Sequence, residues 1–341
     1  MKRYLLPKEG RFYKANLHTH TNMSDGYKTP EEVKAIYKAK GYSVVAYTDH
    51  NTLLPHSDLA DDTFLPLHGV ELDVNEEIEG AEVKEIMCCH IGLISLSNEN
   101  VEQPCWHREW YLYANSPKYK HMVKFDETQP DYIRRYTPEG VSEIMKIARE
   151  KGYFVILNHP VWNNDRFPAY SQFDGMHAIE MFNGSAIIGG YEDYNPRVYD
   201  ELLRCGKRIY CVGADDNHNS QPETSHGFDS GIGYTVIKAP HLDYPSIAQA
   251  LLNGDFYASE GPEIYELWEE DGDIHLKCSP AMRIIVTKNG RRASHIMCSE
   301  DQTVNEFSFR LTDEDKYFRI TVVDKQGKHA CTNAYFTDEM K

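Results

Sequence analysis

The sequence predicts an α/β fold in which strands of a parallel sheet alternate with helices through about residue 260, and closure into a barrel is favoured over an open sheet. Three observations support this prediction: short apolar runs that end in polar residues, helix-start motifs between them, and a change of pattern after about residue 266. A chain of 341 residues is long enough to form a large domain and a small one.

Near-continuous apolar runs mark the predicted strands. The clearest runs cover Ser43–Tyr47, Tyr153–Leu157 and Arg208–Gly213, and polar residues follow each of them closely. Runs of this length and composition are typical of parallel strands that are buried on both faces. Because active sites of α/β barrels lie at the carboxyl ends of the strands, the polar residues at these ends are the candidates for function.

Helix-start motifs precede two of these strands. Thr29–Glu32 reads Thr-Pro-Glu-Glu, a capping box with proline at the first helical position, and Gly41 is placed to end the helix. Thr137–Glu139 opens a second helix in the same way, and Gly152 lies beyond its end. Two further helices are predicted, over residues 193–204 and 244–252.

Two regions interrupt the alternation of strands and helices. Residues 97–136 are polar and rich in Trp and Tyr, which indicates an insertion over one barrel end, either a surface excursion or a substrate lid. From about residue 266, short strand-like runs are separated by turn sequences such as Asn289-Gly290, which is typical of an antiparallel β-domain. We therefore divide the chain into a catalytic barrel, residues 1–265, and a small β-sandwich-like domain of unassigned role, residues 266–341.

Composition and charge exclude several function classes. The net charge of −17 and the lack of a basic stripe argue against a nucleic-acid partner, since phosphate backbones demand clustered Lys and Arg. No apolar run approaches the roughly 20 residues of a membrane span, and the N-terminus lacks the apolar region of a signal peptide. The 8 cysteines include no Cys-x-x-Cys pair, so we expect reduced thiols in a cytoplasmic protein.

Side chains suited to metal binding gather at the predicted strand ends. His18 and His20 point to one side of an extended segment, because side chains alternate with period two, and Asp25 follows closely. The other candidates are His50, Glu71, His90, His159, Asp216 and His218. Any one of these histidines taken separately is more often a hydrogen-bonded core residue. Together, the six histidines and three carboxylates predict a metal centre.

The order of these motifs resembles the PHP family (polymerase and histidinol phosphatase) over roughly residues 14–260. The matching motifs are His18-x-His20, Ser24-Asp25-Gly26, Thr48-Asp49-His50, Gly69-Val70-Glu71, His90, His159-Pro160 and Asp216-x-His218. The resemblance implies a distorted (β/α)7 barrel with three metal ions at its carboxyl-terminal mouth, and hydrolysis of phosphate esters. The end of the chain also resembles PHP proteins with an appended β-domain.

The resemblance further implies how the ligands divide among the metals. The first metal would be held by His18, His20, Glu71 and Asp216; the second by Glu71, His90 and His159; and the third by Asp25, His50 and His218. The ions are divalent, and Zn, Mn or Fe all suit imidazole-rich sites with a bridging carboxylate.

The expected activity is that of a metal-dependent phosphoesterase acting on a phosphomonoester or cyclic phosphodiester of a small molecule. A hydroxide that bridges two metals would be the nucleophile, with Glu71 and Asp216 as the catalytic ligands, because bridging metals depress the pKa of water. The remaining metal would bind phosphoryl oxygens. Phosphoryl transfer depends on positioning and charge stabilisation, which fits a chain with no recognisable Ser-His-Asp arrangement.

Candidates for substrate contacts follow from their place near the motifs. Arg166 follows the His159 motif, and Arg134 and Arg135 end the insertion; each is either a surface arginine or an anion contact. Asn183 ends a strand-like run and is placed for a polar contact. His226 lies in a Gly-containing loop and is either a solvated residue or part of the site.

Two other functions are compatible with the same metal ligands. A metal-dependent hydrolase could instead cleave a carboxylic ester, carbamate or amide, because metal-activated water also attacks carbonyl carbons. A non-catalytic binding protein could use the metals for stability alone. Parallel assays on phosphate and carboxyl esters distinguish the two enzymes, and a metal-bound protein inert to all esters would favour the third function.

Overall fold

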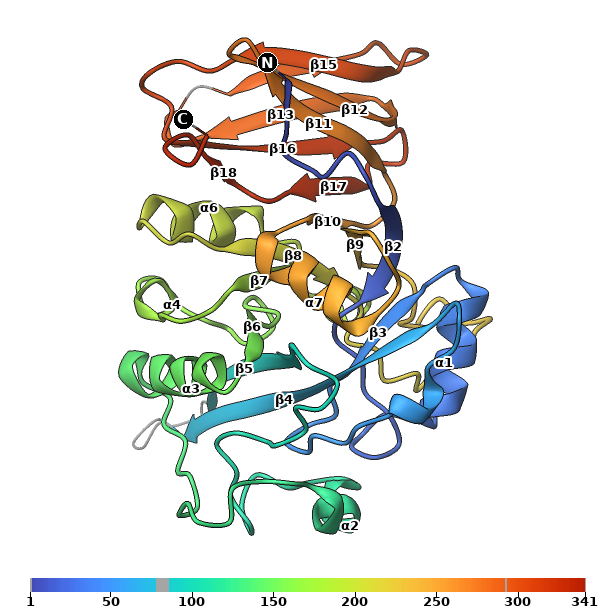
Figure 1. Ribbon diagram of the computed structural model, residues 1–341, viewed down its shortest axis with the longest axis vertical. Coiled ribbons are helices and arrows are strands. Elements are labelled where there is room, and N and C mark those ends of the chain that lie inside the picture. The colour runs from blue at the N-terminus through green and yellow to red at the C-terminus, as the bar shows by residue number, and fades with distance from the viewer. Residues whose placement is uncertain (1, 78–85, 292, 341) are drawn as a thin grey trace.

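The computed structural model describes residues 2–77, 86–291 and 293–340 and has a mixed α/β fold (Figure 1). The strands are β1 (Lys2–Tyr4), β2 (Arg11–Asn16), β3 (Val44–Tyr47), β4 (Leu65–Glu77), β5 (Ile86–Ser95), β6 (Tyr153–Leu157), β7 (Ala178–Asn183), β8 (Tyr210–Ala214), β9 (Tyr234–Ala239), β10 (Phe256–Ser259), β11 (Ile264–Glu270), β12 (Asp273–Ala281), β13 (Arg283–Lys288), β14 (Ser294–Met297), β15 (Val304–Arg310), β16 (Tyr317–Val323), β17 (His329–Thr332) and β18 (Tyr335–Phe336). The α-helices are α1 (Pro30–Ala39), α2 (Ser116–Tyr119), α3 (Pro138–Glu150), α4 (Ala169–Gln172), α5 (Gly184–Ile188), α6 (Pro196–Arg204) and α7 (Tyr244–Asn253).

The strands form two sheets. The larger has 14 strands in the order β14-β13-β16-β17-β10-β9-β2-β3-β4-β5-β6-β7-β8, with β18 paired to β16 beside this path. The smaller is a separate antiparallel sheet of 4 strands in the order β1-β11-β12-β15. The first strand of the chain therefore belongs to the same sheet as strands from its last third, a pairing that the sequence did not predict.

The large sheet is mixed, which corrects the prediction of a parallel arrangement. Strands β2, β3 and β4 run parallel, as do β6, β7 and β8. Strand β5 is antiparallel to both β4 and β6, and β9 is antiparallel to β2. Only residues 78–85 separate β4 from β5, and this is too short for the crossover of about a dozen residues that a parallel pair requires.

The helix boundaries follow the predicted motifs. Thr29 caps α1: its hydroxyl accepts the backbone N–H of Glu32 at 3.3 Å, and the Glu32 carboxylate accepts the Thr29 N–H at 2.9 Å. Thr137 caps α3, and α7 extends one residue beyond the predicted range. Helix α6 begins at Pro196 and not at residue 193. Most of the predicted helix ends are therefore confirmed.

The segments that follow β2 and β8 lie side by side. The backbone N–H of His20 donates to the carbonyl of Asn217 at 3.1 Å, and the N–H of Asp216 donates to the carbonyl of His18 at 3.0 Å. Thr19 and Asn217 form an isolated parallel bridge. In the described part of the chain, the hydrogen-bonded strand order still ends at β8. These hydrogen bonds therefore join the loop after β2 to the loop after β8, but β2 and β8 themselves do not pair.

The C-terminal region contains the predicted antiparallel strands. Near the end of the chain, β17 ends at Thr332, and β18 covers Tyr335–Phe336. Strand β17 pairs with β10, which continues the large sheet into this region. In Figure 1 both termini lie at this β-rich end, and α2 lies at the opposite end of the molecule.

Two findings concern the expectations drawn from composition. No helix within residues 2–77, 86–291 and 293–340 combines the length and the apolar character needed to cross a membrane. All of the described cysteines are free thiols, and most of them are buried.

Candidate metal centre

The structure gathers the predicted metal ligands into one cluster. His18, His20 and Asp25 follow β2, His50 follows β3, and His159 follows β6. Glu71 lies on β4 and His90 on β5, and Asp216 and His218 follow β8. The cluster therefore lies largely at the carboxyl ends of the strands, where the sequence places polar residues.

The first group consists of His18, His20, Glu71 and Asp216, each offering one ligand atom within 4.8 Å of the others. His18 Nε2 lies 3.2 Å from Glu71 Oε1 and 3.2 Å from Asp216 Oδ1. His20 Nε2 lies 2.9 Å from Asp216 Oδ1. All four side chains are buried or nearly so, which leaves their ligand atoms facing one another and not bulk solvent.

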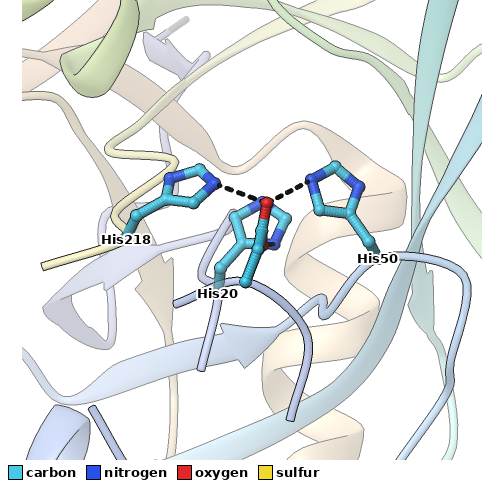
Figure 2. Close-up of side chains that lie close together, drawn as sticks. His20, His50 and His218 are labelled. Carbon is cyan, nitrogen blue, oxygen red and sulfur yellow. Dashed lines mark ion pairs between the residues drawn. The ribbon is translucent and has the colours of Figure 1, made fainter. Parts of the chain in front are cut away.

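The second group consists of His20, Asp25, His50 and His218 (Figure 2). His50 Nε2 and His218 Nε2 approach the same Asp25 oxygen, at 3.6 Å and 3.5 Å. His20 Nδ1 lies 3.6 Å from the other Asp25 oxygen. His20 thus faces the first group with one ring nitrogen and the second group with the other.

The third group consists of His50, Glu71, Asp73 and His90. His90 Nδ1 lies 3.3 Å from Glu71 Oε1, and His159 Nε2 lies 3.1 Å from the same oxygen. His159 adjoins this group without belonging to it, whereas Asp73, which the resemblance did not name, is a member. Glu71 belongs to two groups, as expected of a carboxylate that is shared between ions.

Two of these residues occupy strained backbone conformations. His159 has a φ of +24° and Asp216 a φ of +54°, in the region that side chains larger than glycine rarely adopt. Gly26 allows a tight turn next to Asp25, because a Cβ atom there would lie 2.8 Å from the backbone of His20. Strain of this kind is typical of functional sites, where the surrounding structure holds a side chain in an otherwise unfavourable position.

The carboxylates of the cluster attract positive charge. Burial lowers the pKa of His18, but the Asp216 and Glu71 carboxylates outweigh it and raise that pKa well above its ordinary value. Burial is outweighed by Glu71 in the same way at His159, whose pKa rises to about 9. For Glu71, burial would raise the pKa, but the His18 and His90 imidazoles hold it well below its usual range. The carboxylates are therefore ionised, as metal ligands must be.

The donor atoms of the cluster fit divalent metal ions. Several buried polar atoms have no hydrogen-bond partner: His20 Nδ1, Glu71 Oε2, His90 Nδ1, His159 Nδ1 and Asp216 Oδ1. A buried polar atom without a partner costs about 1–3 kcal/mol, so such a concentration in one place requires an explanation. Metal coordination supplies it, because imidazole nitrogen and carboxylate oxygen suit Zn, Mn and Fe.

Two further carboxylates and an amide orient the cluster. Glu180 on β7 accepts a hydrogen bond from His18 Nδ1 at 2.8 Å, and Asp73 accepts one from His50 Nδ1 at 2.9 Å. The Asn158 amide donates to Glu71 Oε1 at 2.7 Å. The sequence reasoning missed these roles. The only pattern that indicates one of them is the spacing of Asp73 two residues after Glu71, which places both side chains on one face of β4.

Two of the candidates for substrate contacts, Arg134 and Asn183, contact residues of the cluster, and the others lie elsewhere. Arg134 is 6% exposed and donates to the Asp73 carbonyl at 2.9 Å and to the Asn51 side chain. Arg135 and Arg166 are exposed and line other cavities, and His226 is exposed on its loop. Asn183 is buried and donates to Glu180 at 2.9 Å and Asp216 at 3.2 Å, so it supports ligands.

A cavity of about 300 Å³ opens onto the cluster. Its lining includes the side chains of Asp25, His50, Glu71, His90, His159, Asp216 and His218. A larger cavity of about 550 Å³ lies against the insertion and α3, and no metal-ligand candidate lines it. The smaller cavity is therefore the one through which a substrate would reach the cluster.

Comparison with known proteins identifies a family over part of the chain. Residues 16–159 match the PHP domain family. No curated protein matches the chain in sequence.

Two solved structures resemble the chain at low identity. One is a two-domain protein of Bacteroides vulgatus ATCC 8482 described as containing a predicted PHP-like metal-dependent phosphoesterase, with 14% identity, a TM-score of 0.46, and coverage of 97% of this chain and 98% of that chain. The other, from Bifidobacterium adolescentis ATCC 15703, is a metal-dependent phosphoesterase by prediction, with 17% identity, a TM-score of 0.38, and coverage of 66% of this chain and 94% of that chain.

Proposed function

We propose that the protein is a metal-dependent phosphoesterase that hydrolyses a phosphomonoester or cyclic phosphodiester of a small molecule, because residues 16–159 match the PHP domain family. The observation that carries this proposal is the buried cluster of imidazoles and carboxylates beneath a cavity of about 300 Å³. A cavity of this volume is at the lower end of the range for small-molecule sites, about 300–1,000 Å³. We take the distorted (β/α)7 barrel as part of the same proposal.

The proposed ligand sets follow the resemblance. His18, His20, Glu71 and Asp216 would hold one ion; Glu71, His90 and His159 a second; and Asp25, His50 and His218 a third. The close approach of ligand atoms within each set supports the assignment. Asp73 lies beside the second set as a further oxygen donor.

The protein's own side chains would hold the cations in place and orient the histidine ligands. Bound divalent cations would supply Lewis acidity and positive charge opposite the phosphoryl oxygens. Glu71 is shared between two groups and so would hold neighbouring cations close together. Glu180 and Asp73 fix the ring orientations of His18 and His50, and this matters because phosphoryl transfer depends on positioning.

A panel of substrate classes tests this proposal. Chelated protein reloaded with Zn, Mn or Fe is assayed on phosphomonoesters, cyclic phosphodiesters and carboxylic esters. We expect phosphate-ester hydrolysis that disappears on chelation and in Glu71→Gln, and persists in His226→Asn, an exposed histidine outside the cluster. Faster hydrolysis of carboxylic esters would contradict the proposal in favour of the carboxyl hydrolase, and inertness to every ester would favour a metal-stabilised binding protein.

A further inference from the structure

The cavity above the metal cluster has an aromatic rim. Tyr113, Trp162 and Tyr191 line it, and these rings are 39%, 38% and 43% exposed. They come from three separate segments: the insertion, the loop after β6 and the segment after α5. Single exposed aromatic residues are common on protein surfaces, but three around one cavity indicate a ligand-binding surface.

The charge of the lining divides the cavity into two parts. Within the described residues, no Lys or Arg lines it, and its charged side chains are the carboxylates and imidazoles of the cluster. A phosphoryl group would therefore be neutralised by bound cations on the cluster side. The rim offers aromatic faces to the organic group of the substrate. Offset stacking and edge-to-face contacts there favour another planar ring.

The rim rings stand directly over the metal ligands. The ring centroid of Tyr113 lies 5.1 Å from that of His50, and the Trp162 centroid lies 5.2 Å from His90 and 4.9 Å from His159. The Trp162 backbone is fixed by its N–H, which donates to Asp193 at 2.9 Å. An ester whose phosphoryl group reaches the cluster would place its organic group between these rings.

Tyr113 is held in place by neighbours that bind the loops carrying the ligands. The Ser116 hydroxyl donates to the His50 carbonyl at 3.0 Å, and the Asn115 N–H donates to the Ser24 carbonyl at 3.0 Å. Tyr111 and Ala114, on either side, have φ values of +69° and +49°, so the backbone here is strained. The insertion is therefore built against the ligand-bearing loops, and one of its exposed side chains lines the cavity.

We propose that Tyr113, with Trp162 and Tyr191, selects substrates whose organic group is a planar aromatic or heteroaromatic ring. This inference rests on the proposed phosphoesterase function and specifies its substrate class. It also assigns a role to the insertion, which contributes the specificity-determining residue Tyr113 to the mouth of the site.

Binding of inert ligands tests the inference independently of catalysis. Benzylphosphonate and cyclohexylmethylphosphonate carry the same charge and similar bulk, but only the first has a planar ring; methylphosphonate has neither ring. We expect the metal-loaded protein to bind benzylphosphonate about 5-fold more tightly than the cyclohexyl analogue in calorimetric titration, as stacking worth about 1 kcal/mol implies. Metal content is measured on every sample.

Variants of the insertion provide the controls. Tyr113→Ala should lose most of this preference while keeping its metal content, and Tyr113→Phe should retain the preference. Trp110→Ala removes a 54% exposed ring of the same insertion that does not line the cavity, and it should leave the preference unchanged.

The failure of this inference is distinguishable from that of the proposed function. Equal binding of the two ring phosphonates, or no binding of any phosphonate, would overturn the inference, even if phosphate esters are hydrolysed. Ring-selective binding that depends on Tyr113, in a protein that hydrolyses no phosphate ester, would support the rim's role and contradict the phosphoesterase proposal.

Discussion

Asp73 and Glu180 each accept a hydrogen bond from one ring nitrogen of a histidine whose other nitrogen faces the cluster. For His18 that second nitrogen lies 3.2 Å from Glu71, and for His50 it lies 3.6 Å from Asp25. A carboxylate in this position fixes the tautomer and orientation of the imidazole and increases its basicity. At this scale the affinity for metal depends on residues outside the recognisable motifs.

We expect Asp73→Asn to weaken metal binding about 10- to 100-fold, because the amide no longer supplies a charged acceptor to His50. Competition with a chromophoric chelator measures the affinity. Asp62→Asn, at an exposed aspartate, is the matched control and should bind metal as the wild type does. Wild-type affinity in Asp73→Asn would show that Asp73 neither orients His50 nor serves as a ligand.

His177 makes stability depend on pH. Burial, assisted by Arg149, lowers its pKa to about 4, and its Nδ1 accepts the Val155 N–H at 3.0 Å. In the unfolded chain, His177 binds a proton once the pH falls below the usual histidine pKa of 6.5. In the folded protein, His177 stays neutral until about pH 4. This contribution to stability is therefore complete above pH 6.5 and is lost as the pH falls from 6.5 to about 4.

We expect the wild type to lose roughly 2 kcal/mol more stability than His177→Asn between these pH values, after allowance for partial exposure of the ring. Urea unfolding at a series of pH values measures the difference. His56 and His68 also have lowered pKa values and contribute to both profiles, so the comparison isolates His177. Parallel profiles for the two proteins would contradict the prediction.

The insertion shows how one element is fixed to the site. Arg134, near its end, reaches β4 and Asn51, and its guanidinium stacks on Tyr111 at 4.3 Å. Gln103, near its start, donates to the Asn51 carbonyl at 2.8 Å and accepts the Leu53 N–H at 2.7 Å. Both ends of the insertion are thus attached to the segment that follows His50.

Replacement of Arg134 should loosen this attachment. We expect Arg134→Gln to lower the free energy of unfolding by about 2 kcal/mol and to increase hydrogen exchange across residues 103–134, because charged hydrogen bonds and a cation–π contact are lost. Arg135→Gln changes the adjacent, exposed arginine and should do neither. If the two variants behave alike, Arg134 does not anchor the insertion.

The elements also show which parts of the fold the sequence could predict. Local patterns determine the ends of α1, where Thr29 and Glu32 cap each other, and the extent of β6. Long-range pairing is different: nothing near β1 indicates β11 as its partner. In the site, His18 and His20 belong to a recognisable motif, whereas Glu180 becomes a partner of His18 only when β7 is placed in the sheet.

At the scale of the whole molecule, the α/β region is joined to the C-terminal strands of the large sheet. Strand β17 pairs with β10, and the Asn333 amide donates to the carbonyls of Gly254 and Phe256 at 3.0 Å each. A second connection is the bidentate ion pair between Arg319 of β16 and Asp200 of α6, with distances of 2.7 and 2.9 Å. These contacts predict that the α/β region and the C-terminal β region unfold together.

We expect Asp200→Asn to cost about 3 kcal/mol, because it leaves the buried Arg319 guanidinium without its counter-charge. Asp273→Asn breaks an exposed pair with Arg310, which solvent screens, and should change the free energy of unfolding much less than Asp200→Asn does. Urea unfolding followed by both far-UV circular dichroism and tryptophan fluorescence measures the two variants. Separate transitions in the wild type would contradict the predicted cooperativity.

The central claim, that the imidazole–carboxylate cluster is a metal centre, is tested most directly by metal content. Wild type, Glu71→Gln and His226→Asn are reconstituted with Zn, Mn or Fe, dialysed, and analysed by mass spectrometry. The proposal predicts about three ions per chain in the wild type and in His226→Asn, and fewer in Glu71→Gln, because Glu71 is shared between groups. A wild type that retains no more metal than Glu71→Gln would contradict it.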